Sequence, residues 1–133
     1  MIRKTIILAL LLLAAGCNTE APTEDVDKAA TLFFERLKAA QYEDIYNSTS
    51  QQFKDSVAKA TILDNLQQIN AMGRIQVYTR LRMPFEGNEN ERIVSPVYGV
   101  VFDQTTADIT VNFKDEGGEW KLVGFQVKPR RTS

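Results

Sequence analysis

Two short groups of side chains in this sequence have the types and spacing that could perform chemistry. Tyr42, Asp44 and Tyr46 bring phenol hydroxyls close to a carboxylate, and Asp103 supplies a second carboxylate farther along the chain. A carboxylate can act as a general base, and a hydroxyl can donate a hydrogen bond to a developing oxyanion. The competing interpretation places the tyrosine rings in a core and the carboxylates in solvent, and the spacing of the aromatic residues favours it.

Tyr78, Arg80 and Arg82 form the second group, spaced by two along the chain. Arginines at this spacing on a strand can present parallel guanidinium groups to an anion. The competing interpretation is cross-strand pairing with acidic neighbours such as Asp108. Because simple alternation already predicts a polar outer face on a strand, it favours this second interpretation.

The absence of histidine excludes several classes of chemistry. With no His among its 133 residues, the chain has no histidine general base, no Ser-His or Cys-His nucleophile pair and no His-containing metal site. It also lacks the spacing of a glycine-rich phosphate loop or of an EF-hand, so we expect no cofactor. Without residues 1–16, which include Arg3 and Lys4, the formal net charge is (16 − 2) − 17 = −3, and this acidic balance argues against nucleic acid as a general partner.

The only cysteine, Cys17, ends a segment with the pattern of a secreted leader. A basic start precedes Ile6–Ala15, an apolar run too short to span a bilayer as a helix. Leu13-Ala14-Ala15-Gly16-Cys17 resembles the lipobox of bacterial lipoproteins, with Ala14 at the position where leucine is usual. The resemblance implies that residues 1–16 are a signal peptide and that Cys17 carries acyl chains that attach the protein to the membrane.

Asn18 follows the cysteine. In enterobacterial lipoproteins an Asp at this position favours retention in the inner membrane, so the pattern here resembles that of outer-membrane lipoproteins facing the periplasm. We interpret residues 17–23 as the lipidated cysteine and a short tether, and residues 24–133 as a single domain.

The first half of the domain has helical periodicity. Apolar residues recur at spacings of three and four over about 24–40, which predicts one long helix. A second, short helix is predicted around Tyr42–Tyr46, followed by caps and a bend at Asn47–Ser50. A third helix is predicted from Thr61 to about Met72, and Gly73 is a natural stop.

After Gly73 the period changes to two, which predicts four antiparallel strands at about 75–85, 97–104, 107–114 and 120–127. In the first strand we expect one apolar set to face the core: Ile75, Val77, Leu81, Met83 and Phe85. The alternate, polar set should face solvent: Gln76, Tyr78, Arg80 and Arg82. Residues 86–92 are predicted as a charged surface loop, and residues 116–119 as a hairpin turn.

Helices followed by an antiparallel meander resemble the nuclear transport factor 2-like, or cystatin-like, fold. The resemblance rests on Phe33–Tyr46, on Phe53-Lys54 and on Gly118–Phe125, which look like segments of small bacterial proteins of that superfamily. It implies an α+β domain in which three helices pack on a curved four-stranded antiparallel sheet. It also implies a pocket between the two layers, which in the superfamily's enzymes holds a carboxylate base and hydroxyl or acid donors.

The later strands are apolar on both sides. In one strand, Tyr98, Val100 and Phe102 alternate with Val97 and Val101. In the last strand, Trp120 and Leu122 alternate with Val123, Phe125 and Val127. A sheet with one solvated face does not need this pattern. We therefore expect the outer face to be covered by a partner or by a second copy, as the superfamily resemblance also implies, or these residues to continue a pocket.

These observations together predict a non-enzymatic lipoprotein domain that binds a small apolar ligand or a protein partner at the envelope. The candidate contacts are Tyr42, Tyr46, Tyr78, Arg80, Arg82, Tyr98 and Trp120. Two alternatives stay open. One is an enzyme of isomerase or hydrolase type that uses a buried carboxylate, and the other is a structural accessory of an envelope complex without a pocket.

Overall fold

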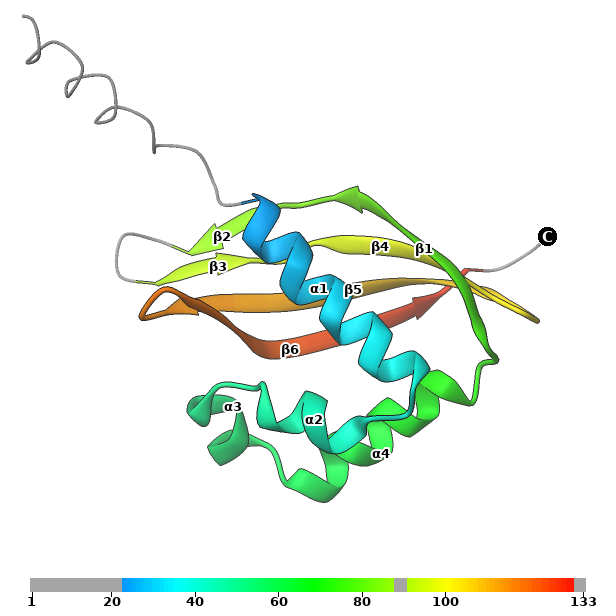
Figure 1. Cartoon of the computed structure of the whole chain (residues 1–133), viewed down its shortest axis with the longest axis horizontal. Coiled ribbons are helices and arrows are strands. Elements are labelled where there is room, and N and C mark those ends of the chain that lie inside the picture. Colours follow the sequence, from blue (N-terminus) through cyan, green and yellow to red (C-terminus); the bar gives the residue numbers. More distant parts are fainter. Residues whose placement is uncertain (1–22, 88–90, 131–133) are drawn as a thin grey trace, which may run out of the picture.

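The computed structural model describes residues 23–87 and 91–130. The helices precede one antiparallel sheet along the chain (Figure 1). The helices are α1 (Thr23–Lys38), α2 (Tyr42–Asn47), α3 (Gln51–Ser56) and α4 (Lys59–Asn70). The strands are β1 (Ile75–Arg82), β2 (Phe85–Gly87), β3 (Arg92–Val94), β4 (Val97–Phe102), β5 (Thr106–Glu116) and β6 (Glu119–Pro129). The predictions for the leader, for Cys17 and for the tether up to residue 22 lie outside the described residues.

The α+β prediction is confirmed, and the open sheet is consistent with the nuclear transport factor 2-like arrangement. The described residues contain four helices where we predicted three, because the middle segment breaks at Ser48–Ser50. Ser50 caps α3 by accepting a hydrogen bond from the Phe53 N–H at 3.1 Å. Thr49 pairs with Leu122 as an isolated parallel bridge, which holds the break against β6.

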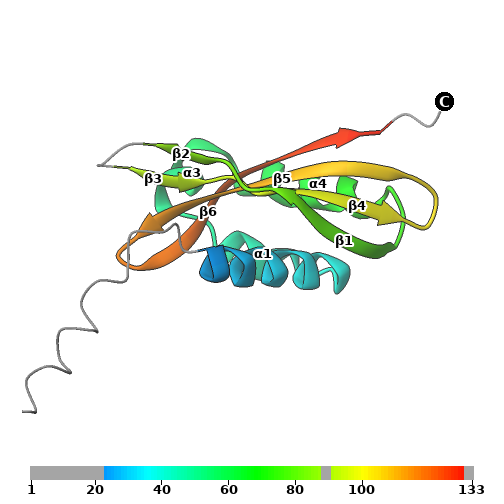
Figure 2. The ribbon, with the colours of Figure 1, turned by 90° about the horizontal axis from the view of Figure 1, so that it is seen from above.

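The sequence of helix α1 accounts for the charges at its two ends and for its buried face. Glu24 and Asp25 lie in its first turn and Arg36 and Lys38 in its last, each complementary to the helix dipole. Its buried stripe faces the sheet and consists of Val26, Ala30, Phe33, Phe34 and Leu37. Figure 1 shows α1 crossing the sheet diagonally, and Figure 2 shows it as a separate layer along one side of the strands.

Strand β5 is the central strand of the sheet. It pairs with β6 on one side, and with β4 and β3 on the other, while β1 extends the sheet beyond β4. The predicted hairpin is confirmed, because Gly117 and Gly118, with φ of 63° and 89°, connect the paired residues Glu116 and Glu119. Strands β1 and β6 therefore lie at edges of the sheet.

Residues 77–80 of β1 present the opposite faces of the sheet from those that we predicted. Ile75 pairs with Phe102 and Val77 pairs with the next residue, Val101, so Gln76 is an extra residue in a bulge. One extra residue reverses the alternation that follows it. Ile75 is 4% exposed whereas Val77 is 50% exposed. The side chains of Tyr78 and Arg80, predicted to face solvent, instead reach α1.

The predicted first strand is also divided in two. It ends at Arg82, and Phe85–Gly87 forms the separate strand β2, which pairs with β3. Part of the segment 86–92 that we predicted as a loop is therefore strand. Leu81 and Phe85, predicted to face the core, are exposed.

A bulge also corrects the interpretation of β6. Asn112 pairs with Gly124 and the next residue, Phe113, pairs with Leu122, so Val123 is the extra residue. This insertion places Trp120 and Leu122 on the same face as Phe125 and Val127, the helix side of the sheet. The two-sided apolarity of β6 therefore has a local cause and does not require a covering partner.

Candidate functional site

The structure brings three of the predicted contact residues together beneath α1. The Tyr98 hydroxyl donates to Asp27 Oδ1 at 3.0 Å, and Arg80 Nη1 donates to Asp27 Oδ2 at 2.5 Å. Asp27 belongs to α1, whereas Arg80 and Tyr98 belong to β1 and β4. Cross-strand pairing of Arg80 with an acidic neighbour is therefore not what the structure shows, and Asp108, the example that we named, accepts from Arg130 Nε at 2.7 Å.

A second phenol–carboxylate contact lies two turns farther along α1. The Tyr78 hydroxyl donates to Glu35 Oε2 at 2.9 Å, and Lys38 Nζ lies 3.5 Å from the same oxygen. The Tyr78 ring stacks on Phe34 with a centroid distance of 4.6 Å. These contacts occupy the carboxylates with donors and fix α1 on the sheet, so they favour a structural role for this cluster.

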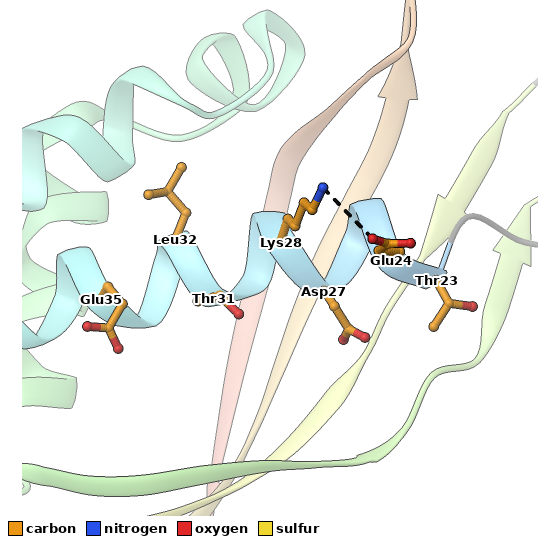
Figure 3. Close-up of a pocket in the computed structure, with 7 residues that line it drawn as sticks. All are labelled: Thr23, Glu24, Asp27, Lys28, Thr31, Leu32 and Glu35. Carbon is orange, nitrogen blue, oxygen red and sulfur yellow. Dashed lines mark ion pairs between the residues drawn. The ribbon is translucent and has the colours of Figure 1, made fainter.

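The surface of α1 beside these carboxylates is hollowed, with a volume of about 580 Å³ (Figure 3). Asp27 and Glu35 point from α1 toward the side of β1, while Leu32 and Lys28 point away from it. Every described residue that lines this hollow belongs to α1. Among the described residues, no other element contributes a wall to this hollow.

Both tyrosines of this cluster are held in the protonated form. Burial raises the pKa of Tyr98 well above its usual range, and the hydrogen bond to Asp27 adds to the effect. Burial, followed by the hydrogen bond to Glu35, raises the pKa of Tyr78. The phenols are therefore hydrogen-bond donors at neutral pH.

The raised tyrosine pKa values predict a loss of stability at alkaline pH. In the unfolded chain these phenols ionise near pH 10, whereas in the folded protein they still hold their protons. The stabilisation is complete below that pH and is lost as the pH rises through the folded-state pKa values. We expect the urea midpoint to fall between about pH 9 and pH 11.5. The decline should be shallower in Tyr98→Phe, and an equally steep decline in that variant would contradict the assignment.

The other candidate residues are dispersed. Tyr42 accepts a hydrogen bond from Asn70 Nδ2 at 2.7 Å, and the same nitrogen also donates to the Leu37 carbonyl at 2.7 Å. The Tyr46 ring lies near two ammonium groups, with Lys54 Nζ at 5.5 Å and Lys59 Nζ at 5.2 Å from its centroid. Both rings pack against the core, as the favoured interpretation predicted.

The two remaining carboxylates of the first candidate group are exposed and lie in different parts of the fold. Asp44 lies on α2, and Asp103 accepts a hydrogen bond from the Arg74 N–H at 3.1 Å. Arg82 is exposed at the end of β1. Trp120 lies near the β5–β6 turn, where the Arg92 guanidinium is 5.6 Å from its ring centroid. The structure therefore does not assemble these residues into one site.

A groove between α4 and the free edge of β6 is a better candidate binding site. Its volume is about 470 Å³, within the range of small-molecule sites. The apolar side chains that line it are Ile69, Met72, Phe125, Val127 and Pro129. Asn65 and Gln68 add two carboxamides from α4. We predicted Ile69 and Met72 to face inward but did not identify this groove.

The groove has the chemistry of a binding site rather than of a reaction centre. None of the described residues that line it is ionisable, so it offers no general base and no charge for a transition state. Apolar walls with a few carboxamides are typical of sites that bury an apolar group and orient it by hydrogen bonds. The α4 spacing at 65, 68, 69 and 72 was the sequence signal for one wall, since these positions share one helix face.

The sheet face away from α1 carries a second apolar feature. Val77 and Leu81 of β1 and Val101 of β4 are exposed there. A Leu81 methyl lies 3.4 Å from the place that a Cβ on Gly99 would occupy, which puts Leu81 on this face. Trp120 faces the opposite way, so a dimer through this face would use the three aliphatic residues instead.

The fold and the site define an α+β domain with an apolar groove beside an edge strand. No family model matches the sequence, and no curated protein matches it. Among residues 23–87 and 91–130, no three metal-binding side chains form a cluster that could hold an ion. No helix in this part of the chain is long and apolar enough to span a membrane.

Proposed function

We propose that this protein is a lipid-anchored domain of the bacterial envelope that binds an apolar ligand or partner segment in the groove between α4 and β6, without catalysing a reaction. The observation that carries the proposal is the lining of the groove, which joins five apolar side chains to the carboxamides of Asn65 and Gln68. Burial of apolar surface supplies affinity, and the carboxamides supply orientation.

The sequence around Cys17 supports the location. Its resemblance to a lipobox and the Asn18 that follows it favour attachment to the outer membrane, with the domain in the periplasm. The helical and sheet elements also support membership among small lipoproteins with a nuclear transport factor 2-like domain. The tether before α1 is short, so the groove would stay close to the membrane surface.

The enzymatic alternative has less support. It needs a carboxylate that faces a cavity with a free oxygen, and Asp27 uses one oxygen for Tyr98 and the other for Arg80. Glu35 is engaged by Tyr78 and lies near Lys38. Such contacts position α1 rather than a substrate.

Mass spectrometry of the full chain, purified from the membranes of its own cells, tests the proposal. Under denaturing conditions we expect a chain that begins at Cys17 with added acyl mass. Under native conditions we expect an additional ligand mass that Met72→Glu removes, because the variant places a charge in the groove. Val101→Glu makes the same kind of change on the other sheet face and should keep the ligand.

Two outcomes would contradict the proposal: equal ligand retention in Met72→Glu and in the parent, or no retained mass in either. A dimer mass that Val101→Glu removes would identify the exposed aliphatic face as a self-association surface.

A further inference from the structure

The free edge of β6 already accepts an added segment of this chain. The Leu122 N–H donates to the Ser48 carbonyl at 3.2 Å, and the Ser50 N–H donates to the Leu122 carbonyl at 2.9 Å. Both backbone groups of Leu122 thus point away from β5. Ser48–Ser50 then turns into α3, and beyond this point the edge of β6 continues along the groove.

A hydrogen bond at the end of β6 shows which way the backbone groups of residues 125–129 point. The Arg130 N–H donates to the Thr106 carbonyl at 3.0 Å, so Arg130 faces β5. Pro129, its neighbour, therefore faces the free edge. In an antiparallel ladder the backbone groups of successive residues point to opposite sides. Val127 and Phe125, which pair with Ile109 and Val111, hence direct their N–H and C=O groups to the groove.

These backbone groups are polar atoms on an otherwise apolar wall. No described residue forms a backbone hydrogen bond with Phe125 or Val127 on this side of β6. A purely apolar ligand in the groove would remove water from these four groups and leave them without partners, which is costly. An extended polypeptide instead supplies alternating donors and acceptors at the spacing of the strand.

The α4 wall of the groove offers hydrogen-bond partners to the other edge of such an extended polypeptide. Asn65 and Gln68 lie three residues apart on one face of α4. Gln68 Nε2 donates to Asp64 Oδ2 at 2.8 Å, which leaves the Gln68 amide oxygen as an acceptor. An inserted strand turns half of its backbone groups toward β6 and the other half toward these carboxamides.

We propose that the groove takes an extended, uncharged segment of a partner polypeptide, which adds as a strand to β6 beside Phe125 and Val127 and hydrogen-bonds to Asn65 and Gln68. Its alternate side chains, packed against Met72 and Ile69, are apolar, because the described groove lining has no charge to pair with. From Phe125 to Pro129 the edge is about 13 Å long, enough for about five paired residues. This inference rests on the proposed function and names the class of ligand for the same groove.

A blocked, uncharged peptide of about seven residues, alternating valine and threonine, is the probe. It is added to the full chain in lipid nanodiscs, and amide hydrogen exchange is followed by NMR. Strand addition should slow exchange at the Phe125 and Val127 amides but not at Gln126, whose amide already belongs to the β5 ladder. Binding without selective protection of these two amides would overturn strand addition.

Two variants of the same residue separate backbone from side-chain effects. Val127→Pro removes an edge N–H that is outside the β5 ladder, so the sheet should tolerate it, and peptide affinity should fall about tenfold. Val127→Ala keeps the N–H and should lose at most about threefold. Equal losses in the two variants would contradict backbone pairing.

Methylated peptides provide a test that does not depend on the folding of a variant. N-methylation of alternate residues blocks one edge of the peptide, and methylation of the intervening residues blocks the other edge. We expect each form to bind at least about tenfold more weakly to the parent protein. Unchanged or tighter binding of both would exclude strand addition.

These results test separately whether the groove is a ligand site and whether the ligand adds as a strand to β6. A non-peptide mass that is retained by the parent and lost in Met72→Glu, together with no binding of the peptide, would leave the groove as a ligand site and refute strand addition. Equal retention in Met72→Glu, together with failure of the peptide, would refute both.

Discussion

Phe34→Ala should lower the free energy of unfolding by about 3–5 kcal/mol. Phe34 has no exposed surface and lies at the centre of an aromatic cluster. Its ring centroid is 4.6 Å from that of Tyr78, 5.0 Å from that of Tyr98 and 5.2 Å from that of Phe33. The substitution leaves a cavity between α1 and the sheet and removes the aromatic contacts together, which explains the large expected effect.

Leu32→Ala is the matched control for this prediction. Leu32 lies two residues away on the same helix and is 49% exposed, so its truncation should change stability by less than about 1 kcal/mol. Urea unfolding of both variants, with the slope compared to that of the parent, measures the difference. Similar midpoints for the two variants would show that the aromatic cluster does not hold α1 on the sheet.

The cluster around Phe34 also explains how the fold limits function. Asp27 and Glu35 are eight residues apart on α1 and hydrogen-bond to phenols from β4 and β1. These contacts occupy both carboxylates and fix α1 on the helix side of the sheet. At β6, backbone pairing with Ser48–Ser50 stops at Leu122, which leaves the strand edge beside α4 without a backbone partner among the described residues.

Elements whose signals are local could be predicted from the sequence. The stripe of α1 and the Gly117-Gly118 turn each depend on a few neighbouring residues. The faces of β1 and β6 could not be predicted, because the register shifts at two places in β1 and at one in β6, and each shift moves later residues to the other face. In β1, apolar and polar residues alternate on both sides of Gln76, so the sequence does not mark the insertion.

The bulges also limit what the sequence predicts about the cluster beneath α1 and about the groove. Tyr78, Arg80 and Tyr98 were identified by type, but the bulge at Gln76 decides that Tyr78 and Arg80 meet Glu35 and Asp27 of α1. For the groove, the α4 wall has a readable spacing, whereas the β6 wall depends on the bulge at Val123. Unpaired backbone groups carry no residue signature at all, so the edge at Phe125 and Val127 becomes visible only in the folded sheet.

Gly73→Ala should lower the free energy of unfolding by about 2–4 kcal/mol, for two separable reasons. Gly73 has a φ of 128°, a conformation that L residues rarely adopt. A Cβ built on it would also collide with Asp103 Oδ1. The carboxylate would have to move and give up its hydrogen bond from the Arg74 N–H, which closes the connection between α4 and β1.

Two comparisons separate backbone strain from the collision. Gly117 also has a positive φ, of 63°, but no atom lies within 4 Å of a Cβ built there. Gly117→Ala should therefore cost only about 1–2 kcal/mol. In an Asp103→Ala background the collision is absent, so Gly73→Ala should cost about 1 kcal/mol less than it does in the parent. Urea midpoints of the four proteins of this cycle measure the coupling. Equal costs in both backgrounds would mean that backbone strain alone, and not the Asp103 carboxylate, requires glycine at position 73.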